Sequence, residues 1–549
     1  MSRIGRLFLS GDEAVALAAR DGHVALGTGY PGTPSTEILE YFSTLGGRAQ
    51  WAPNEKVALE VGLGAAFGGA RALVTMKHVG LNVAADPLFT AAYTGVAGGL
   101  VIVSADDPGM ASSQNEQDNR RYAVAAGIPM LEPADSQDAY EFTLLAIEIS
   151  ERWKTPVLLR MTTRVCHSKT VMQPAAASNS PRPPWFERDI PGRVMIPAFA
   201  RPAHGRLRQK LEGLGGWNDA SGPNRLIPGG SEVGIVTSGI AYMHVREAAG
   251  GRAAILKLGM TYPLPLEHVS RFARSVKRCI AVEEGDPYLV ESLRTAGIAI
   301  EGKPEMYRFG ELNVARVRRI LACDHAPDPL PPAGKPPELC PGCPHRTVFT
   351  ALRDLDCIVA GDIGCYTLGV LPPFSAMDTC VCMGASIGVG LGLRHVLPRE
   401  QARRVVSVLG DSTFIHSGIT GLVEMVYNPP ATGHLVIILD NGTTAMTGMQ
   451  EHPGTGRALD HGRAAKVVIE DLVRAVGIHD IAVVDPTSDP AAFQAMVARA
   501  LQSAELSVLI ARRNCLLAAS RIKSYERAIA MHENGEAKPP APTRDSRVV

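Results

Sequence analysis

The chain has 549 residues, and its 55 Lys and Arg residues are balanced by 55 Asp and Glu residues. This length is too great for one hydrophobic core, so about three domains of roughly 100–200 residues each are expected. The zero net charge gives no reason to expect a nucleic-acid partner or a polybasic membrane patch.

The apolar runs are too short for a signal peptide or a membrane span. We therefore expect a cytosolic protein, in which ten cysteines indicate thiols or metal ligands before disulfides. Short β-branched runs such as "ALVTM", "GLVIVS" and "HLVIILD" alternate with helical patterns. This alternation predicts an α/β protein whose parallel sheets are covered on both faces.

The first α/β unit is expected over residues 1–175 and begins with the turn "TGYPGTPSTEI". Thr33 is a good N-cap and Pro34 a good first helical residue. Further on, Glu55 opens a helix of small residues, and Glu60 lies one helical face away. Either glutamate could be a solvated helix residue, so the residues alone leave open which of them has a function.

Changes in composition divide the rest of the chain. Pro, Gly, Ser and Asn cluster between the first two units, and a proline-rich joint precedes the third unit. The expected parts are a linker at 176–232, a second unit at 233–325, a third unit at 335–520 and a flexible tail at 521–549.

Cys340 and Cys343 stand three positions apart in "ELCPGCPHRT". Zinc would require two more Cys or His ligands at compact spacing. A redox disulfide of the thioredoxin type would follow a strand, whereas a proline-rich segment precedes this pair. The Cys-x-x-Cys alone is therefore compatible with zinc, a redox disulfide or an iron–sulfur cluster.

Two apolar runs of the third unit end in polar residues, Gly410-Asp411-Ser412 and Asp440-Asn441. One strand–helix–strand crossover would bring Asp411 and Asn441 to the carboxyl edge of a sheet, where ligands bind. Their oxygens, with a backbone carbonyl, suit a Mg²⁺ ion that bridges a diphosphate, and glycine allows close approach of the backbone. A Gly-Asp alone would more often be a simple strand-ending turn.

This arrangement resembles the thiamin diphosphate signature, Gly-Asp-Gly followed by a spaced Asn. The resemblance implies that Asp411, Asn441 and the carbonyl of Thr443 bind Mg²⁺. Ser412 replaces the last glycine of the signature, and its hydroxyl could bond a phosphate oxygen. Gly410 and Gly384, the latter in "MGASIG", are also expected at the cofactor.

The first unit resembles the corresponding domain of 2-oxoacid:ferredoxin oxidoreductases. The resemblance favours Glu55 over Glu60 as the glutamate that hydrogen-bonds the aminopyrimidine ring of thiamin diphosphate, because Gly64 and Gly80-Leu81 follow it in register. It also implies that Thr33 faces the substrate. Tyr30 and Pro31, in the same turn, are expected at the cofactor.

The order of cysteines in the third unit is similar to that of the same family. A Cys-x-x-Cys is followed by a Gly-Cys after the first strand and a Cys after the last strand. The resemblance implies one [4Fe-4S] cluster on the four thiolates of Cys340, Cys343, Cys365 and Cys515. Cys380 and Cys382 are expected to be buried core thiols instead.

From about residue 8 to 520, motifs such as "GDIGCYTLG" and "ADDPGMASSQNEQD" resemble the α subunits of indolepyruvate:ferredoxin oxidoreductases. The second unit matches their transketolase C-terminal-like domain. The resemblance implies oxidative decarboxylation of an aryl 2-oxoacid, indolepyruvate or phenylpyruvate, to the acyl-CoA. It also implies a small β subunit as partner and ferredoxin or another protein as electron acceptor.

Roles for Lys77, His78, His416 and His452 are undetermined, and a structural role is favoured for each histidine. Because no cysteine follows Cys515, the family's C-terminal ferredoxin domain is expected to be absent and the electrons to leave through another chain. Two alternatives are a non-redox thiamin-dependent decarboxylase or carboligase, and a non-catalytic electron-transfer subunit.

Overall fold

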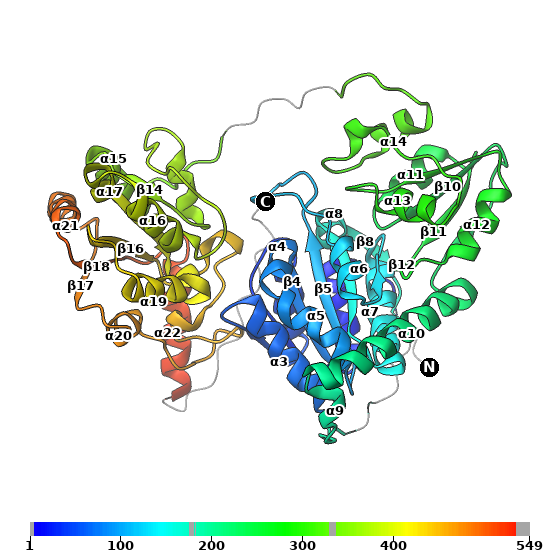
Figure 1. The fold of residues 1–549 in the computed structure, drawn as a ribbon, viewed down its shortest axis with the longest axis horizontal. Coiled ribbons are helices and arrows are strands. Elements are labelled where there is room, and N and C mark those ends of the chain that lie inside the picture. The colour runs from blue at the N-terminus through cyan, green and yellow to red at the C-terminus, as the bar shows by residue number, and fades with distance from the viewer. Residues whose placement is uncertain (1–4, 175–180, 182, 329–335, 534–549) are drawn as a thin grey trace. The chain divides into compact units, whose positions relative to one another are not determined.

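The computed structural model describes residues 5–174, 181, 183–328 and 336–533. The chain divides into two compact units, Met1–Pro332 and Ala333–Val549, whose elements are shown in Figure 1. Parallel sheets flanked by helices make up both units, which confirms the predicted α/β fold.

The first unit contains a seven-stranded sheet in the order β12-β6-β7-β5-β4-β2-β3. All of its pairs are parallel except β12 with β6. Its strands are β2 (Leu26–Gly29), β3 (Ala49–Trp51), β4 (Ala72–Lys77), β5 (Leu100–Asp106), β6 (Met130–Leu131), β7 (Val157–Thr162) and β12 (Met260–Tyr262). A separate antiparallel pair joins β1 (Leu7–Ser10) to β8 (Lys169–Met172).

Helices cover both faces of this sheet because successive strand residues point to opposite sides. Val74 and Ile102 pack in the cluster that includes α3 and α5, whereas Leu73, Val101 and Val103 pack with α1, α2 and α7. The helices are α1 (Gly11–Asp21), α2 (Thr36–Thr44), α3 (Glu55–Phe67), α4 (His78–Val83), α5 (Ala85–Thr94), α6 (Arg120–Ala126), α7 (Ser136–Trp153) and α8 (Thr163–His167).

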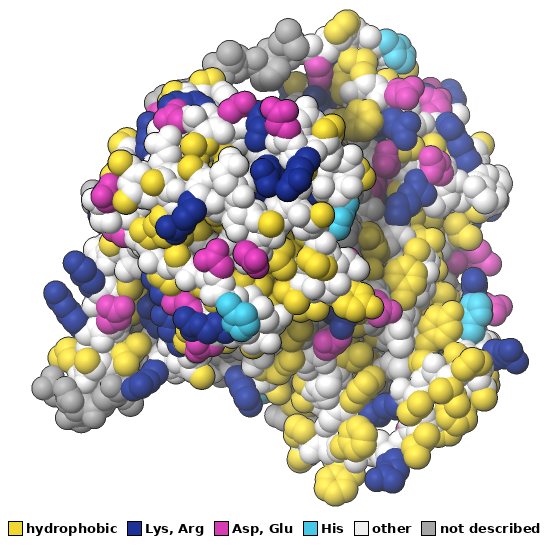
Figure 2. Space-filling view, turned by 60° about the vertical axis from the view of Figure 1, so that its left-hand side comes forward, with side chains coloured by type: hydrophobic (Ala, Val, Ile, Leu, Met, Phe, Trp, Pro, Cys, Tyr) yellow, Lys and Arg dark blue, Asp and Glu magenta, His cyan; other side chains and the backbone are white. Residues whose placement is uncertain are grey.

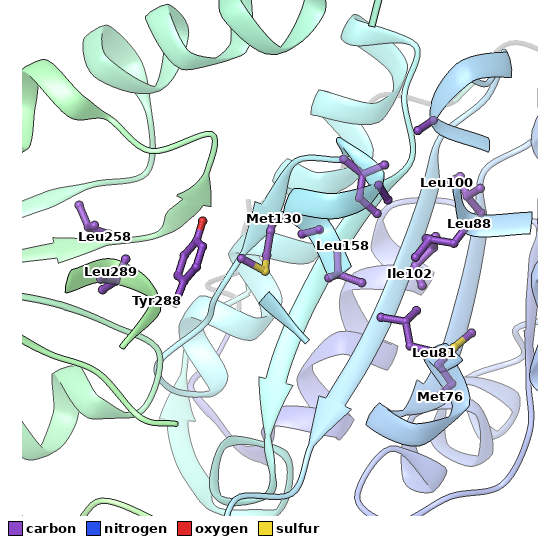
Figure 3. Packing of buried hydrophobic residues seen from close by; sticks show 14 of the residues in the cluster. Met76, Leu81, Leu88, Leu100, Ile102, Met130, Leu158, Leu258, Tyr288 and Leu289 are labelled. Atoms are coloured by element: carbon purple, nitrogen blue, oxygen red, sulfur yellow. The ribbon is translucent and has the colours of Figure 1, made fainter. Parts of the chain in front are cut away.

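A four-stranded sheet, β13-β10-β11-β9, completes the first unit. Its strands are β9 (Arg225–Ile227), β10 (Val233–Ser238), β11 (Ala254–Leu258) and β13 (Arg278–Val282), and its helices are α11 (Ala241–Ala249), α12 (Leu266–Arg274), α13 (Tyr288–Thr295) and α14 (Val314–Leu321). One hydrophobic cluster runs from Leu100 and Ile102 through Met130 to Leu258 and Leu289, so the two sheets share a core (Figure 3).

The segment 176–232 differs from the expected linker. It contains the four-residue helix α9 (Ile190–Arg193) and the 25-residue helix α10 (Pro197–Ser221), which packs against α5 and α12. Leu207 and Leu214 of α10 are buried on one face, and Asn218 donates hydrogen bonds to the carbonyls of Met260 and Pro263. The Pro and Gly content concealed an apolar pattern at helical spacing. Residues 176–180 and 182 of the expected linker, and residue 175 just before it, lie outside the described residues.

The second unit is built on a five-stranded parallel sheet in the order β14-β15-β16-β18-β17. Its strands are β14 (Ile358–Ala360), β15 (Val405–Gly410), β16 (His434–Asp440), β17 (Asp480–Val484) and β18 (Leu506–Arg512). Its helices are α15 (Pro344–Asp354), α16 (Ala385–Val396), α17 (Arg399–Arg404), α18 (Asp411–Thr413), α19 (Ile419–Tyr427), α20 (Ile469–Ala475), α21 (Pro490–Gln502) and α22 (Ala519–Glu533).

The expected flexible tail over 521–549 is wrong in its first part, because α22 continues to Glu533 and buries Ile522. The rest of the expected tail, residues 534–549, lies outside the described residues. Across the part of the chain that the structure describes, no helix combines the length and the apolar character that a bilayer span requires. Basic and acidic side chains are interspersed over the face in Figure 2, in keeping with the balanced charge.

Candidate active site

The predicted polar edge of the five-stranded sheet is present. Strands β15 and β16 are parallel neighbours, with Gly410 opposite Leu439, so Asp411 and Asn441 follow adjacent strand ends. Both side chains are buried. Adjacent buried carboxylate and amide oxygens fit a hard cation such as Mg²⁺, so this pair could hold the ion of a diphosphate cofactor.

Asp411 is surrounded by donors. Its Oδ1 accepts a hydrogen bond from the Ser412 N–H at 2.9 Å, and its Oδ2 accepts one from the Gly442 N–H at 2.9 Å. The His452 Nε2 lies 3.2 Å from the same Oδ2. Burial would raise the pKa of Asp411, but His452 and the two N–H groups outweigh burial and hold that pKa below its usual range. The site therefore keeps an ionised carboxylate at the strand end.

Hydroxyl groups line the same edge. The Thr444 hydroxyl donates to Ser412 Oγ at 3.2 Å, and the Thr443 N–H donates to Asn441 Oδ1 at 3.1 Å. A π-helical turn over Phe414–Gly418 follows the strand end, and π turns are frequent at functional sites. The Ser412 hydroxyl therefore belongs to a row of polar groups at this edge, and its contact with a phosphate stays a prediction.

Gly384 begins α16 with a φ of 84°, where a side chain would be strained and a Cβ would meet Ser417 Cβ at 2.5 Å. Its N–H donates to Asp362 Oδ1 at 2.9 Å, and the Ser386 N–H donates to Asp362 Oδ2 at 3.0 Å. Sequence reasoning missed Asp362 as the residue that holds this helix start. The available signal was its position in "GDIGC", a second Gly-Asp after an apolar strand.

The four predicted cysteines interact electrostatically. Burial, followed by the charges of Cys515, Cys343 and Cys340, raises the pKa of the Cys365 thiol to about 11. Burial also raises the pKa of Cys343, with contributions from Cys340 and Cys515. The Cys343 N–H donates to the Cys340 carbonyl at 3.0 Å, and a Cβ at Gly342 would lie 3.3 Å from Leu516 Cδ1. The Cys-x-x-Cys loop therefore lies against the segment that follows β18.

A [4Fe-4S] cluster requires four thiolate ligands, and Cys340, Cys343, Cys365 and Cys515 supply four thiols that act on one another. The residues present therefore match the ligand chemistry of such a cluster. The Cys515 N–H also donates to the Asn441 carbonyl at 2.9 Å, which links the cysteines to the cation edge.

Cys380 and Cys382 are exposed, so the prediction of buried core thiols is wrong. They lie in the irregular segment between β14 and α16, outside any strand or helix that would turn them inward. The pKa of each thiol is raised by partial burial and then by the charge of Asp362.

The structure distinguishes the two candidate glutamates of the first unit. Glu55 is 5% exposed at the start of α3, which the Asn54 side chain caps by accepting from the Val57 N–H at 2.9 Å. Glu60 is 43% exposed and forms an ion pair with Lys56. A Cβ at Gly80 would lie 2.7 Å from Glu55 Oε1, so only glycine leaves room for this carboxyl group. Glu55 is therefore a buried, sterically positioned acid, and Glu60 is a solvated one.

The helix after the Tyr30-Pro31 turn begins later than predicted. It starts at Thr36 with Ser35 as the N-cap residue, so the prediction of Thr33 as the cap is wrong. The Ser35 hydroxyl donates to the Gly32 carbonyl at 3.1 Å, and the Gly32 N–H donates to Thr36 Oγ1 at 3.1 Å. These local bonds close a turn before the helix and leave Thr33 in that turn. Tyr30 and Pro31 are buried beside it.

The remaining polar candidates have protein partners. Lys77 Nζ donates to the Ser112 carbonyl at 2.7 Å, and burial lowers its pKa. His78 Nε2 lies 3.1 Å from the Asn115 carbonyl, and His416 Nδ1 lies 2.6 Å from Ser417 Oγ. Any substrate role for these side chains stays a prediction.

A buried charge network in the first unit was missed altogether. Arg120 donates to Glu283 at 2.7 Å, and Arg160 donates to Asp106 at 2.8 Å and to Glu132. Arg120 and Glu283 are 163 positions apart, and no local motif marks either residue. The network joins the two sheets of this unit.

The chain was compared with known proteins. A family model described as "Thiamine pyrophosphate enzyme, C-terminal TPP binding domain" matches residues 362–511, and one described as "Pyruvate flavodoxin/ferredoxin oxidoreductase, thiamine diP-bdg" matches residues 18–184. A solved 2-oxoglutarate:ferredoxin oxidoreductase from Magnetococcus marinus shares the fold, with a TM-score of 0.50 at 19% identity, over 58% of this chain and 65% of that one.

Two curated relatives are named "Indolepyruvate oxidoreductase subunit IorA". The protein from Methanothermobacter thermautotrophicus is 41% identical over 95% of this chain and 89% of its own length. The protein from Archaeoglobus fulgidus is 39% identical over 96% of this chain and 89% of its own length. The chain therefore belongs to the IorA family of thiamin diphosphate-dependent 2-oxoacid oxidoreductases, enzymes of oxidative 2-oxoacid decarboxylation.

Proposed function

We propose that the chain oxidatively decarboxylates an aryl 2-oxoacid, with indolepyruvate as the first candidate and phenylpyruvate as the second. The carbon–carbon bond to the carboxylate breaks and carbon dioxide leaves. The acyl carbon forms a thioester with coenzyme A, and one proton and two electrons are released. Cys340, Cys343, Cys365 and Cys515 would hold a [4Fe-4S] cluster, which would supply one-electron transfer toward ferredoxin or a partner subunit.

The observation that carries this proposal is the position of the four thiols beside the cation edge. Cys515 is hydrogen-bonded to Asn441, and its charge acts on Cys343 and Cys365. A non-redox decarboxylase or carboligase, the alternative function, would use the edge at Asp411 and Asn441 but has no need of these thiols.

Thiamin diphosphate, when bound, supplies the electron sink that lets the carboxylate leave. Asp411, Asn441 and the carbonyl of Thr443 would hold the Mg²⁺ ion, with Gly410, Ser412 and Gly384 near the diphosphate. Glu55 would hold or release a proton through its hydrogen bond to the aminopyrimidine ring. These assignments use the buried acids and hydroxyls described above.

Thr33 would face the substrate, and Tyr30 and Pro31 of the same turn would lie at the cofactor. Residues 1–175 would form the pyrimidine-binding domain, 233–325 the transketolase C-terminal-like domain and 335–520 the diphosphate-binding domain. The name "subunit" of the relatives supports a heteromer with a small β subunit.

The experiment is an anaerobic assay of the complex with thiamin diphosphate, Mg²⁺ and coenzyme A, in which a viologen dye reports electrons. Indolepyruvate and phenylpyruvate are compared with pyruvate and 2-oxoglutarate. We expect dye reduction with the aryl acids and about 100-fold lower kcat/KM with the others. Carbon dioxide release without dye reduction would instead establish the non-redox function.

The cluster is tested separately by iron content and EPR. Cys365→Ser is expected to lose the reduced-cluster signal and most of the bound iron. Cys357→Ser is the matched control, because the Cys357 thiol is also partly buried but does not interact with the other four. Equal iron in both variants would remove the cluster from this proposal.

A further inference from the structure

Three side chains that can bind metals converge where three helices of the first unit meet. They are Asp12 in the first turn of α1, Glu37 in the first turn of α2 and His167 at the end of α8. One ligand atom of each lies within 4.8 Å of the other two. Neither the thiamin chemistry nor the cluster uses any of these residues.

The buried Asp12 carboxyl group lacks an N–H or O–H donor. Asp12 is 0% exposed, and the polar side chain that reaches it is the Cys166 thiol, a weak donor. Glu37 Oε2 is buried and has no partner, although the Glu37 side chain as a whole is 38% exposed. An unpaired buried carboxylate is costly, and the helix N-terminus offsets only a small part of the cost. A positive group is therefore required between Asp12 and Glu37.

That positive group is either a proton or a metal ion. A shared proton would draw the two carboxyl groups into a hydrogen bond of about 2.5–2.7 Å, and no such bond is present. His167 Nε2 lies 4.0 Å from Glu37 Oε2. This distance is too long for a hydrogen bond and exceeds the separation of about 3.4 Å between two tetrahedral zinc ligands, so a small rotation of the exposed His167 side chain would bring both atoms onto one ion.

We propose that Asp12, Glu37 and His167 form a binding site for a divalent metal ion of the zinc class. Two carboxylates neutralise a 2+ ion, and oxygen and imidazole nitrogen are both zinc ligands. The Cys166 thiol adjoins Asp12 but is not part of this three-residue group.

The local sequence builds this site by close helix contacts. A Cβ at Gly11 would lie 2.2 Å from the Val165 carbonyl, so glycine is needed for the start of α1 to approach α8. Ser10 caps α1 through the Glu13 N–H at 3.2 Å. Glu37 directly follows the turn that contains Thr33, so the ion would fix the position of that turn. The metal site does not depend on the proposed substrate.

The test uses the full chain with its iron cluster loaded and with Mg²⁺ and thiamin diphosphate present. The cysteines and the cofactor site are then filled before the protein is dialysed against Zn²⁺ and analysed by mass spectrometry. The wild type is expected to hold one more zinc ion than Asp12→Asn or His167→Ala, at equal iron. Glu40→Gln, on the same helix as Glu37, is the matched control and should bind as the wild type does.

Thermal unfolding gives an independent result. Zn²⁺ in excess is expected to raise the Tm of the wild type and of Glu40→Gln by several degrees, and to leave Asp12→Asn and His167→Ala unchanged. His167 is exposed, so His167→Ala keeps the test valid if Asp12→Asn does not fold. Equal zinc in all four proteins, or the same shift in all four, would overturn the proposal.

Discussion

Two buried acids, Asp411 in the second unit and Glu55 in the first, are held in different ways. In the second unit, Asp411 is surrounded by His452 and two backbone N–H groups, so its charge is stabilised by donors. In the first unit, the Glu55 carboxyl group lies against Gly80, where any larger residue would contact it. Donors thus stabilise the charge of Asp411, whereas close packing against Gly80 limits the positions open to Glu55. Substitutions that change only the charge, or only the space around the side chain, should therefore affect Asp411 and Glu55 differently.

The largest effect is expected from Asp411→Asn, which keeps the shape and removes the charge. The Mg²⁺ ligand would weaken and the donors of Ser412, Gly442 and His452 would lose their acceptor charge, so we expect kcat/KM to fall by about 10³-fold or more. Turnover and thiamin diphosphate affinity are measured together. Asp471→Asn is the control, because Asp471 forms only an exposed ion pair with Arg474. Its kcat/KM and cofactor affinity should equal those of the wild type. Retention of more than a tenth of the activity would contradict the role of Asp411.

A smaller loss of turnover is expected from Glu55→Gln. The amide keeps the volume but cannot hold or release the proton, so kcat should fall by about 10²-fold while cofactor affinity changes only a few-fold. Glu60→Gln, exposed on the same helix, should stay within about two-fold of the wild type. If Glu60→Gln were the slower variant, the choice between the two glutamates would be reversed.

Gly80→Ala tests shape alone. The added Cβ would lie 2.6 Å from Glu55 Cγ, so the carboxyl group must move and we expect about a ten-fold loss of kcat with a destabilisation of about 1–3 kcal/mol. Gly64→Ala is the matched control, because its Cβ meets open space on α3 and alanine favours a helix. Activity loss in Gly64→Ala of the same size would show that the effect is not steric at Glu55.

The residues at the strand ends could be predicted from the sequence, because their positions follow from short apolar runs and the polar residues that end them. An apolar run that stops at Asp411, and the next one that stops before Asn441, must meet at one edge of a parallel sheet. The bond from His452 to Asp411 was not predictable, because it depends on the path of a long loop. The pair Arg120 and Glu283 was missed for the same reason, since only the packing of two sheets brings them together.

Residues whose positions depend on irregular backbone were predicted worst. Cys382 was expected in the core and is exposed, because no strand or helix fixes its direction. Thr33 was expected to cap a helix, but side-chain bonds from Ser35 and Thr36 close a turn first. Sequence periodicity describes regular elements, whereas hydrogen bonds within turns set where those elements begin.

Glu284 provides the smallest and most specific test, because its charge is governed by burial rather than by donors. Burial raises the pKa of Glu284 to about 7, although the Leu312 N–H donates to its Oε1 at 2.8 Å. The folded state thus binds this proton more tightly than the unfolded chain, whose carboxyl group titrates near 4.5. The stabilisation is complete below pH 4.5 and is lost as the pH rises to about 7.

The free energy of unfolding should therefore fall by about 2–3 kcal/mol more in the wild type than in Glu284→Gln between pH 5 and pH 8. Urea unfolding of both proteins across this range measures the difference. Glu305→Gln, whose side chain is 85% exposed, is the control and should follow the wild-type curve. Parallel curves for Glu284→Gln and the wild type would mean that donors stabilise the Glu284 charge, as they do that of Asp411, and that burial does not govern the charge of this acid.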